Sequence, residues 1–549
     1  MRAFITILVL ASCATKPALP PVRFTNAPPA LAVNDRRDVP RQPHEPEFVR
    51  WLYNFDGQFH RRITRALELR RPQRALGVNA LDEVPNSTWF TNRIGARFVS
   101  PEEIFAAPGG VGSPEAHKPW TIVSTKAGGA TVGFIIKDAR GEKFLLKFDP
   151  LGHPETETAT HVIMGKLLWA FGLNVTEDYV AYIAKHDLVL ATDAVVKDEF
   201  GHKRPLDQRE LDTRLATIEA STDGTMRVLV SHWLSGKPLG GHAFEGVRED
   251  DPNDRIPHEL RRDLRGAYAL FSWLDHNDIH GANVLDMWVA DPGDPQRHYV
   301  KHYWIDFGTA LGFAAHKNRE PRFGFEFYLD FAAVASSLVT FGALDRTWEH
   351  RRDPPVRGVG MLETELYDPG TWVSSTPAYV PIYIADRIDK FWGAKIIMRF
   401  TREQIAAAVD SARLSDPRAA TWLVDRLIAR QRATGRYWFE RVNPLDDFAI
   451  GDGTLCFKDL SIAAAFVAAR TTSYDLRFYD RNGNTVGSTQ ARAGDIGVTC
   501  ANAILAGDED GYTIVRIDTT RARFSGTTYV HLARTPGTNA PRVIGIWRP

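Results

Sequence analysis

The sequence is poor in cysteine and has no excess of charge of either sign. Its 549 residues include three cysteines, too few for a disulfide-rich scaffold. The 67 lysines and arginines balance 67 aspartates and glutamates, and a nucleic-acid-binding domain normally has a basic excess. We therefore expect no nucleic-acid partner. Hydrophobic residues make up 44% and charged residues 24%, as in globular proteins, and the length is sufficient for two or three domains.

The N-terminus lacks an apolar run long enough to span a bilayer, which takes about 20 residues. Arg2 is followed by a short apolar run, Ala3 to Leu10, and then by Leu10-Ala11-Ser12-Cys13. This order is typical of an export signal and resembles a bacterial lipobox. The resemblance implies a signal peptide at residues 1–12, lipidation of Cys13 and a place in the cell envelope, at the outer membrane if the host has two. The alternative is a cytoplasmic protein with an apolar start.

The other two cysteines, Cys456 and Cys500, both lie in the C-terminal region. In an oxidising compartment they are candidates for a disulfide, which would stabilise the domain by roughly 4 kcal/mol. The alternative is two unrelated buried thiols.

Pattern changes along the chain predict an α+β protein of several parts. We expect a proline-rich tether at 13–45, a helical extension at 46–118 and a strand-rich region at 119–240. A helical region at 241–442 and a β-sandwich-like domain at 443–549 follow. Residues 325–440 are expected to be mainly helical. A helix at 47–70 has a basic face, and we favour its packing on the main domain over a membrane surface.

Residues 119–150 read as three strands with a glycine-bearing turn that contains Gly128, Gly129 and Gly133. Lys147 lies in the third strand among apolar residues, where a buried ammonium needs a charged partner. The next helix offers Glu157 or Glu155 at its start, and Gly172 is its expected end.

The most informative segment is His276-Asn277-Asp278-Ile279-His280-Gly281-Ala282-Asn283, followed by a predicted hairpin and then Asp306-Phe307-Gly308. Asn283 precedes the first strand of the hairpin and Asp306 follows the second. Because the two ends of an antiparallel hairpin lie side by side, we expect an amide oxygen and a carboxylate to converge, with Asp278 on the same loop.

This set of residues suits phosphoryl transfer. Asn283 and Asp306 provide the oxygen ligands that Mg²⁺ prefers, and Asp278 can accept the proton of an attacking hydroxyl. Lys147 is a candidate for holding the phosphates that are not transferred.

These motifs resemble the protein-kinase-like superfamily over roughly residues 119–330. Asp278 and Asn283 have the spacing of the kinase catalytic loop, His276 stands at its first position, and Asp306-Phe307-Gly308 matches the Asp-Phe-Gly motif. The resemblance implies a bilobal fold and a site for ATP and Mg²⁺. The catalytic residues that it implies are Lys147, Asp278, Asn283 and Asp306. The nucleotide-binding residues that it implies are Gly128, Gly129, Gly133, Lys147, Glu157 and His280.

The departures from ordinary protein kinases concern the substrate class. His280 stands where they usually have lysine or arginine, and in this the loop resembles small-molecule kinases and lipid and HipA-like kinases. Spore-coat and secretory-pathway kinases are a further exported comparison. The glycine turn lacks Gly-x-Gly-x-x-Gly, and no Ala-Pro-Glu follows Asp306. The acceptor, whether protein, glycan or small molecule, stays open.

Two alternatives use the same residues. His276 and His280 superficially suggest a zinc site, but no glutamate follows the first histidine as in His-Glu-x-x-His. A lipid-anchored protein outside the cytoplasm would meet little ATP, so a kinase-shaped binding module without catalysis is the second alternative. The retained lysine, base and metal ligands favour an active phosphotransferase.

Overall fold

The computed structural model describes residues 19–46, 52, 55–67, 72–127, 131–198, 202–314 and 321–549. Cys13 with the rest of the predicted signal, Gly128 and Gly129 lie outside these residues. The chain divides into two compact units, a smaller one built mainly from 442–549 and a larger one built from 30–79 and 83–441. In the described part, no helix combines the length and apolar character needed to cross a membrane.

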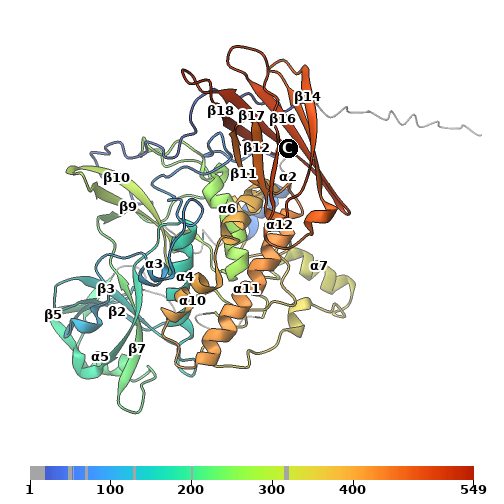
Figure 1. The fold of residues 1–549 in the computed structure, drawn as a ribbon. Helices are drawn as coiled ribbons and strands as arrows, with labels where there is room; N and C mark the ends of the chain where they lie inside the picture. The colour runs from blue at the N-terminus through green and yellow to red at the C-terminus, as the bar shows by residue number, and fades with distance from the viewer. Residues whose placement is uncertain are drawn as a thin grey trace, which may run out of the picture. The chain divides into compact units, whose positions relative to one another are not determined.

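The larger unit contains a seven-stranded sheet in the order β4-β7-β3-β2-β1-β5-β6 (Figure 1). All neighbouring strands are antiparallel except β1 and β5. The three strands predicted for 119–150 are confirmed. The bounds are β1 (Trp120–Thr125), β2 (Gly133–Lys137), β3 (Lys143–Phe148), β4 (Asp178–Ala184), β5 (Leu188–Lys197), β6 (Lys203–Pro205) and β7 (Thr225–His232).

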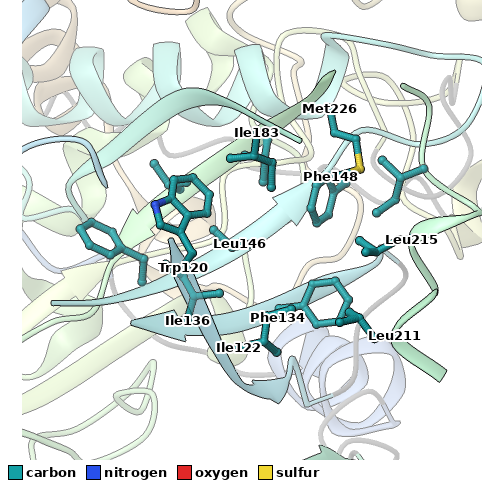
Figure 2. Packing of buried hydrophobic residues seen from close by; sticks show 14 of the residues in the cluster. Trp120, Ile122, Phe134, Ile136, Leu146, Phe148, Ile183, Leu211, Leu215 and Met226 are labelled. Carbon is teal, nitrogen blue, oxygen red and sulfur yellow. The ribbon is translucent and has the colours of Figure 1, made fainter. Parts of the chain in front are cut away.

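The alternation of side chains along β3 decides where Lys147 points. Phe144, Leu146 and Phe148 lie on one face and belong to a buried cluster that includes residues of α5 (Gln208–Leu215), part of which Figure 2 shows. Because successive residues of a strand face opposite sides, Lys147 lies on the other face. That face meets α4 (Thr156–Phe171), which is buried along nearly its whole length and ends at Gly172 as predicted.

The predicted hairpin is present and belongs to a small sheet in the order β10-β9-β8. Helix α6 (Arg262–Leu274) leads into the loop that carries Asp278, and a single 3-10 turn, Gly281–Asn283, follows it. The strands are β8 (Lys237–Pro238), β9 (Val284–Asp291) and β10 (Asp294–Trp304).

Residues 325–440 are less helical than expected. The stretch 340–379 has one 3-10 turn, Thr347–His350, as its only helical element. Prolines 354, 355, 369 and 377 and glycines 342, 358, 360 and 370 lie in this stretch, and both residue types interrupt helices. The helices of the region are α7 (Phe331–Val339), α8 (Val380–Ile384), α9 (Arg387–Ile397), α10 (Arg402–Asp410) and α11 (Pro417–Phe439).

Helices α6 and α9 approach each other closely because two glycines face one another. A Cβ atom on Gly393 would lie 2.2 Å from the carbonyl oxygen of Gly266, and one on Gly266 would lie 2.3 Å from the Trp392 ring. The contact leaves no room for a side chain at either position.

The residues before the seven-stranded sheet contain short elements: a π-helical turn at Asp56–His60, α2 (Arg61–Leu67), α3 (Pro101–Ala106) and a 3-10 turn at Pro114–Ala116. The segment 19–46, in the range predicted as a tether, has no helix or strand of its own. It nevertheless makes specific contacts within each unit: the Phe24 amide donates to the Tyr512 hydroxyl in the smaller unit, and the Trp288 indole donates to the Val39 carbonyl in the larger.

The smaller unit contains the predicted antiparallel sheets, in the orders β11-β12-β15 and β14-β13-β16-β17-β18, and side chains from both sheets share one buried core. The predicted disulfide, Cys456–Cys500, joins directly opposed residues of β12 and β15. The bounds are β11 (Leu445–Gly451), β12 (Thr454–Asp459), α12 (Leu460–Ala463), β13 (Ser473–Tyr479), β14 (Thr485–Arg492), β15 (Val498–Asn502), β16 (Thr513–Arg521), β17 (Phe524–Arg534) and β18 (Pro541–Trp547).

Candidate active site

The two ends of the β9–β10 hairpin meet as the sequence predicts. Val284 pairs with Trp304, and the Ile305 amide donates to the Asn283 carbonyl at 3.0 Å. Asp306 follows with φ of 58°, in the left-handed region that aspartate tolerates better than most residues. Asn283 and Asp306 thus lie at the same end of the hairpin.

Lys147 reaches Asp306 from the seven-stranded sheet. Its ammonium donates to Asp306 Oδ1 at 2.6 Å, and only 5% of the lysine side chain is exposed, against 46% of the aspartate side chain. Burial alone would raise the pKa of Asp306, but Lys147 and His161 hold it well below its usual range. Burial alone would lower the pKa of Lys147, whereas Asp306 and Glu157 raise it. Both groups are therefore charged at neutral pH.

The partner expected for Lys147 differs from the one observed. Glu155 accepts from the Ser415 amide at 3.1 Å and so points elsewhere. Glu157 lines the same cavity as Lys147, but its Oε2 is buried and receives no hydrogen bond from the described residues. Burial raises the pKa of Glu157 to about 7; Lys147 lowers it in part and Asp306 raises it further. The direct ion pair of Lys147 is therefore with Asp306, and Glu157 acts on it only through its charge.

The raised pKa of Glu157 makes protein stability depend on pH. The ordinary pKa is 4.5, so the folded protein binds this proton more tightly than the unfolded chain does. The contribution of Glu157 to stability is then fully present below about pH 4.5 and is lost as pH rises through about 7, a change of at most about 3 kcal/mol. We expect Glu157→Gln to flatten this slope and to raise the melting temperature of the nucleotide-free protein at pH 8.

Melting curves between pH 5 and 8 measure this effect. Glu155→Gln is the matched control, since its carboxylate lies two residues away and accepts from Ser415 instead. An equal change in slope in both variants would contradict the assignment to Glu157.

His161 is a residue of the site that the sequence reasoning missed. It lies on α4, four residues after Glu157, and is fully buried. Its Nε2 accepts from the Phe307 amide at 3.1 Å, which places the ring proton on Nδ1, 3.0 Å from Asp178 Oδ2. His161 therefore fixes the backbone beside Asp306. A histidine one helical turn after Glu157, on the same side of the helix, was the available signal.

The catalytic-loop residues contact one another. The Asn283 amide donates to the Asp278 carbonyl at 2.7 Å, and His280 Nε2 lies 3.0 Å from Asp278 Oδ1. Burial raises the pKa of Asp278, but the interaction with His280 lowers it by more than that. The pKa of Asp278 therefore lies below its ordinary value. Asp278 is therefore ionised at neutral pH.

The two histidines of the loop do not form the zinc site considered above. His276 is buried with Nδ1 3.3 Å from the Thr309 carbonyl, and burial lowers its pKa to about 4. His280 Nδ1 accepts from the Ala282 amide, and its other nitrogen contacts Asp278. Among the described residues, the one group of His, Cys, Asp and Glu whose ligand atoms lie close enough to share an ion is elsewhere.

These residues surround a cavity of about 690 Å³, within the usual range for small-molecule sites. One part of its wall is polar and the other largely apolar. The polar wall includes Lys147, Glu157, Asp278, Asn283 and Asp306, and the apolar wall includes Leu145, Trp233, Leu234, Leu285, Met287 and Ile305.

The glycine turn contributes a cation that the sequence reasoning did not single out. Lys126 lines the cavity and donates to the Thr131 hydroxyl at 3.2 Å, and burial lowers its pKa. Gly133 has a packing reason to be glycine, because a Cβ there would lie 2.6 Å from the Leu146 carbonyl oxygen.

No family model and no curated protein matches the chain. Solved structures of protein kinases do. A Golgi casein kinase with Mn/ADP bound is 11% identical, with a TM-score of 0.29 over 58% of this chain and 72% of that one. The Rio2 kinase from Chaetomium thermophilum, in an ADP/Mg²⁺-phosphoaspartate complex, is 14% identical, with a TM-score of 0.21 over 55% and 73%. Identities and TM-scores this low carry no argument about what this chain does.

Proposed function

We propose that this chain is a kinase-like phosphotransferase that uses ATP and Mg²⁺ and phosphorylates a hydroxyl group of a protein, glycan or small molecule. One observation carries the proposal: Lys147, Asp278, Asn283 and Asp306, which come from separate strands and loops, line one cavity. Phosphoryl transfer needs a cation for the phosphates, metal ligands and a proton acceptor, and these four side chains supply all three.

The residues present fit a hard dication. The Asn283 nitrogen is engaged by the Asp278 carbonyl, so its amide oxygen is the atom left for a ligand role. Nearly half of the Asp306 side chain is exposed, and that residue lines the cavity. An amide oxygen beside a carboxylate suits Mg²⁺, which when bound would neutralise phosphate charge.

The chain's own residues have distinct roles in this proposal. Lys147 would bind the phosphates that stay behind, Asp306 and Asn283 would hold Mg²⁺, and Glu157 would balance the charge of Lys147. Asp278 orients the acceptor hydroxyl and takes its proton. The apolar wall between Leu145 and Met287 encloses the base of the nucleotide. We also propose a lipid anchor on Cys13 and a place in the cell envelope, which the disulfide of the smaller unit supports.

The test is a thermal-shift titration of the full-length protein with ATP and Mg²⁺. A ligand that binds only the folded state stabilises it by about 2.7 kcal/mol at 100 times its Kd. We expect the melting temperature to rise only when both components are present. The rise should be lost in Asp306→Ala and kept in Asp193→Ala, which changes an exposed aspartate of β5. No rise with any nucleotide would favour the alternative, a binding module without catalysis.

A further inference from the structure

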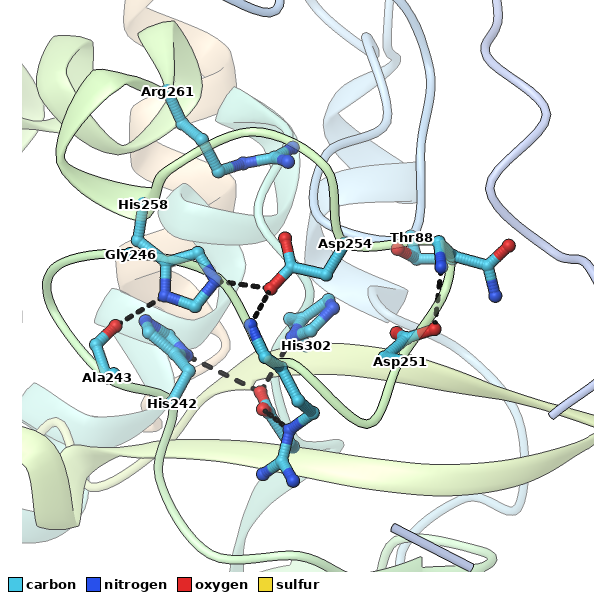
Figure 3. Close-up of polar contacts among 12 residues, drawn as sticks. Thr88, His242, Ala243, Gly246, Asp251, Asp254, His258, Arg261 and His302 are labelled. Carbon is cyan, nitrogen blue, oxygen red and sulfur yellow. Dashed lines mark hydrogen bonds and ion pairs between the residues drawn. The ribbon is translucent and has the colours of Figure 1, made fainter. Parts of the chain in front are cut away.

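Three buried side chains form a cluster apart from the residues proposed to act on ATP. Asp286 on β9 and His302 on β10 are directly paired across the hairpin, and His242 comes from the segment after β8. All three are almost completely buried. Each offers a ligand atom, and these atoms lie within 4.8 Å of one another. Figure 3 shows His242 and His302 converging on the same point.

The hydrogen bonding of the cluster is incomplete. His302 Nδ1 lies 2.6 Å from Asp286 Oδ1, but His242 Nδ1 lies 3.5 Å from the same oxygen. Neither ring nitrogen of His242 makes a hydrogen bond within the described part of the chain, although the side chain is 1% exposed. A buried imidazole with both nitrogens unused costs free energy unless something else binds it.

The charged groups around the cluster, Arg248 and His258, bind other atoms than Asp286 Oδ1. Arg248 Nε donates to Asp286 Oδ2 at 3.1 Å and leaves Oδ1 facing the two imidazoles. A third histidine, His258, lies nearby. Its Nε2 is hydrogen-bonded to the Asp254 carboxylate and its Nδ1 to the Ala243 carbonyl, so both ring nitrogens have partners and neither is a further ligand (Figure 3).

The distances suit a small dication after local adjustment, since the ligand atoms lie within 4.8 Å of one another. A tetrahedral ion with bonds of about 2.0–2.1 Å holds its ligand atoms about 3.4 Å apart. The distance between His242 Nδ1 and Asp286 Oδ1, 3.5 Å, is already close to this value. The distance between His302 Nδ1 and Asp286 Oδ1 is shorter, 2.6 Å, because the two atoms share a proton. An entering ion would replace that proton, and the two atoms would move apart by less than about 1 Å.

Of the three side chains, only His242 lines a second cavity, of about 420 Å³, together with Gly240, Gly241 and Phe244. An ion that enters the cluster from this cavity would therefore meet His242 first. Trp89 packs on both imidazoles: it stacks on His302 with ring centroids 3.5 Å apart and meets His242 edge to face at 4.9 Å.

We propose that His242, Asp286 and His302 bind a transition-metal dication of the Zn²⁺ class. Two imidazoles and one carboxylate are the ligands of such ions and not of Mg²⁺, which prefers oxygen. The ion would join the segment around His242 to the β9–β10 hairpin. Asp286 lies three residues after Asn283 and His302 four residues before Asp306, so the ion would stabilise the hairpin that presents both. This inference does not depend on the chain being a kinase.

The experiment uses the full-length protein, stripped with a chelator and dialysed against Zn²⁺, with metal measured by mass spectrometry. We expect about one tightly bound zinc ion per chain, and a melting temperature that falls on chelation and recovers with zinc. Uptake should be lost in His242→Ala and His302→Ala. It should persist in His258→Ala, a neighbouring buried histidine, and in Asp306→Ala, which separates this site from the nucleotide site.

A measurement on the unchanged protein covers the case in which a variant does not fold. Co²⁺ in a tetrahedral nitrogen and oxygen site gives intense visible absorption, and Zn²⁺ should displace it. Absence of zinc from the dialysed wild-type protein would overturn the proposal. So would weak octahedral Co²⁺ absorption, or zinc uptake that is unchanged in both His242→Ala and His302→Ala.

Discussion

Replacing Asp278 with asparagine is expected to lower the rate of phosphoryl transfer by about 10³-fold while nucleotide affinity stays close to wild type. The amide cannot accept the hydroxyl proton, but it has nearly the same shape, and the bond from Asn283 goes to the Asp278 backbone carbonyl. Transfer from radiolabelled ATP gives the rate, and calorimetry gives the affinity.

Asp294→Asn is the matched control, since this exposed aspartate lies at the turn of the β9–β10 hairpin, at the end away from the cavity. We expect wild-type rates from it. A ten-fold loss or less in Asp278→Asn would contradict the role of Asp278 as proton acceptor. A large loss of nucleotide affinity would instead indicate a binding role.

Asp389→Ala is expected to destabilise the larger unit by about 3–5 kcal/mol. Asp389 on α9 is fully buried and pairs with two arginines of α6, Arg262 at 2.7 Å and Arg265 at 3.4 Å. Its removal leaves two buried guanidinium groups without their common carboxylate. Calorimetric melting of the full-length protein measures the loss.

Asp425→Ala tests whether burial is the cause. Asp425 also pairs with an arginine, Arg402, but both side chains are more than half exposed. An exposed pair contributes about 1 kcal/mol or less. Equal destabilisation by the two variants would contradict the argument from burial.

The part of the site that depends on residues close together in the sequence was predicted. The approach of Asn283 and Asp306 follows from the hairpin alone, and the position of Lys147 in a buried strand follows from its apolar neighbours. The pairing of Lys147 with Asp306 instead of Glu157 did not follow. It depends on the rotamer of a long side chain between two carboxylates, which spacing does not specify.

Contacts between distant segments were also beyond the sequence. His161 bridges Asp178 and the Phe307 amide, and the cluster of His242, Asp286 and His302 joins two strands to a loop. Each of these residues is unremarkable in its local context. The irregular stretch 340–379 was predictable from its prolines and glycines, although it lies in the range 325–440 that was expected to be mainly helical.

The contact between α6 and α9 restricts how this sequence can diverge. Because the Gly266 carbonyl lies where a Gly393 side chain would be, and Trp392 lies where a Gly266 side chain would be, a substitution at either position forces the helices apart. A compensating change would need a smaller residue than tryptophan at position 392 and a shift of the backbone. Distant relatives should therefore keep this small–small pair even where the loops and the smaller unit have changed, which makes it a marker for recognising them.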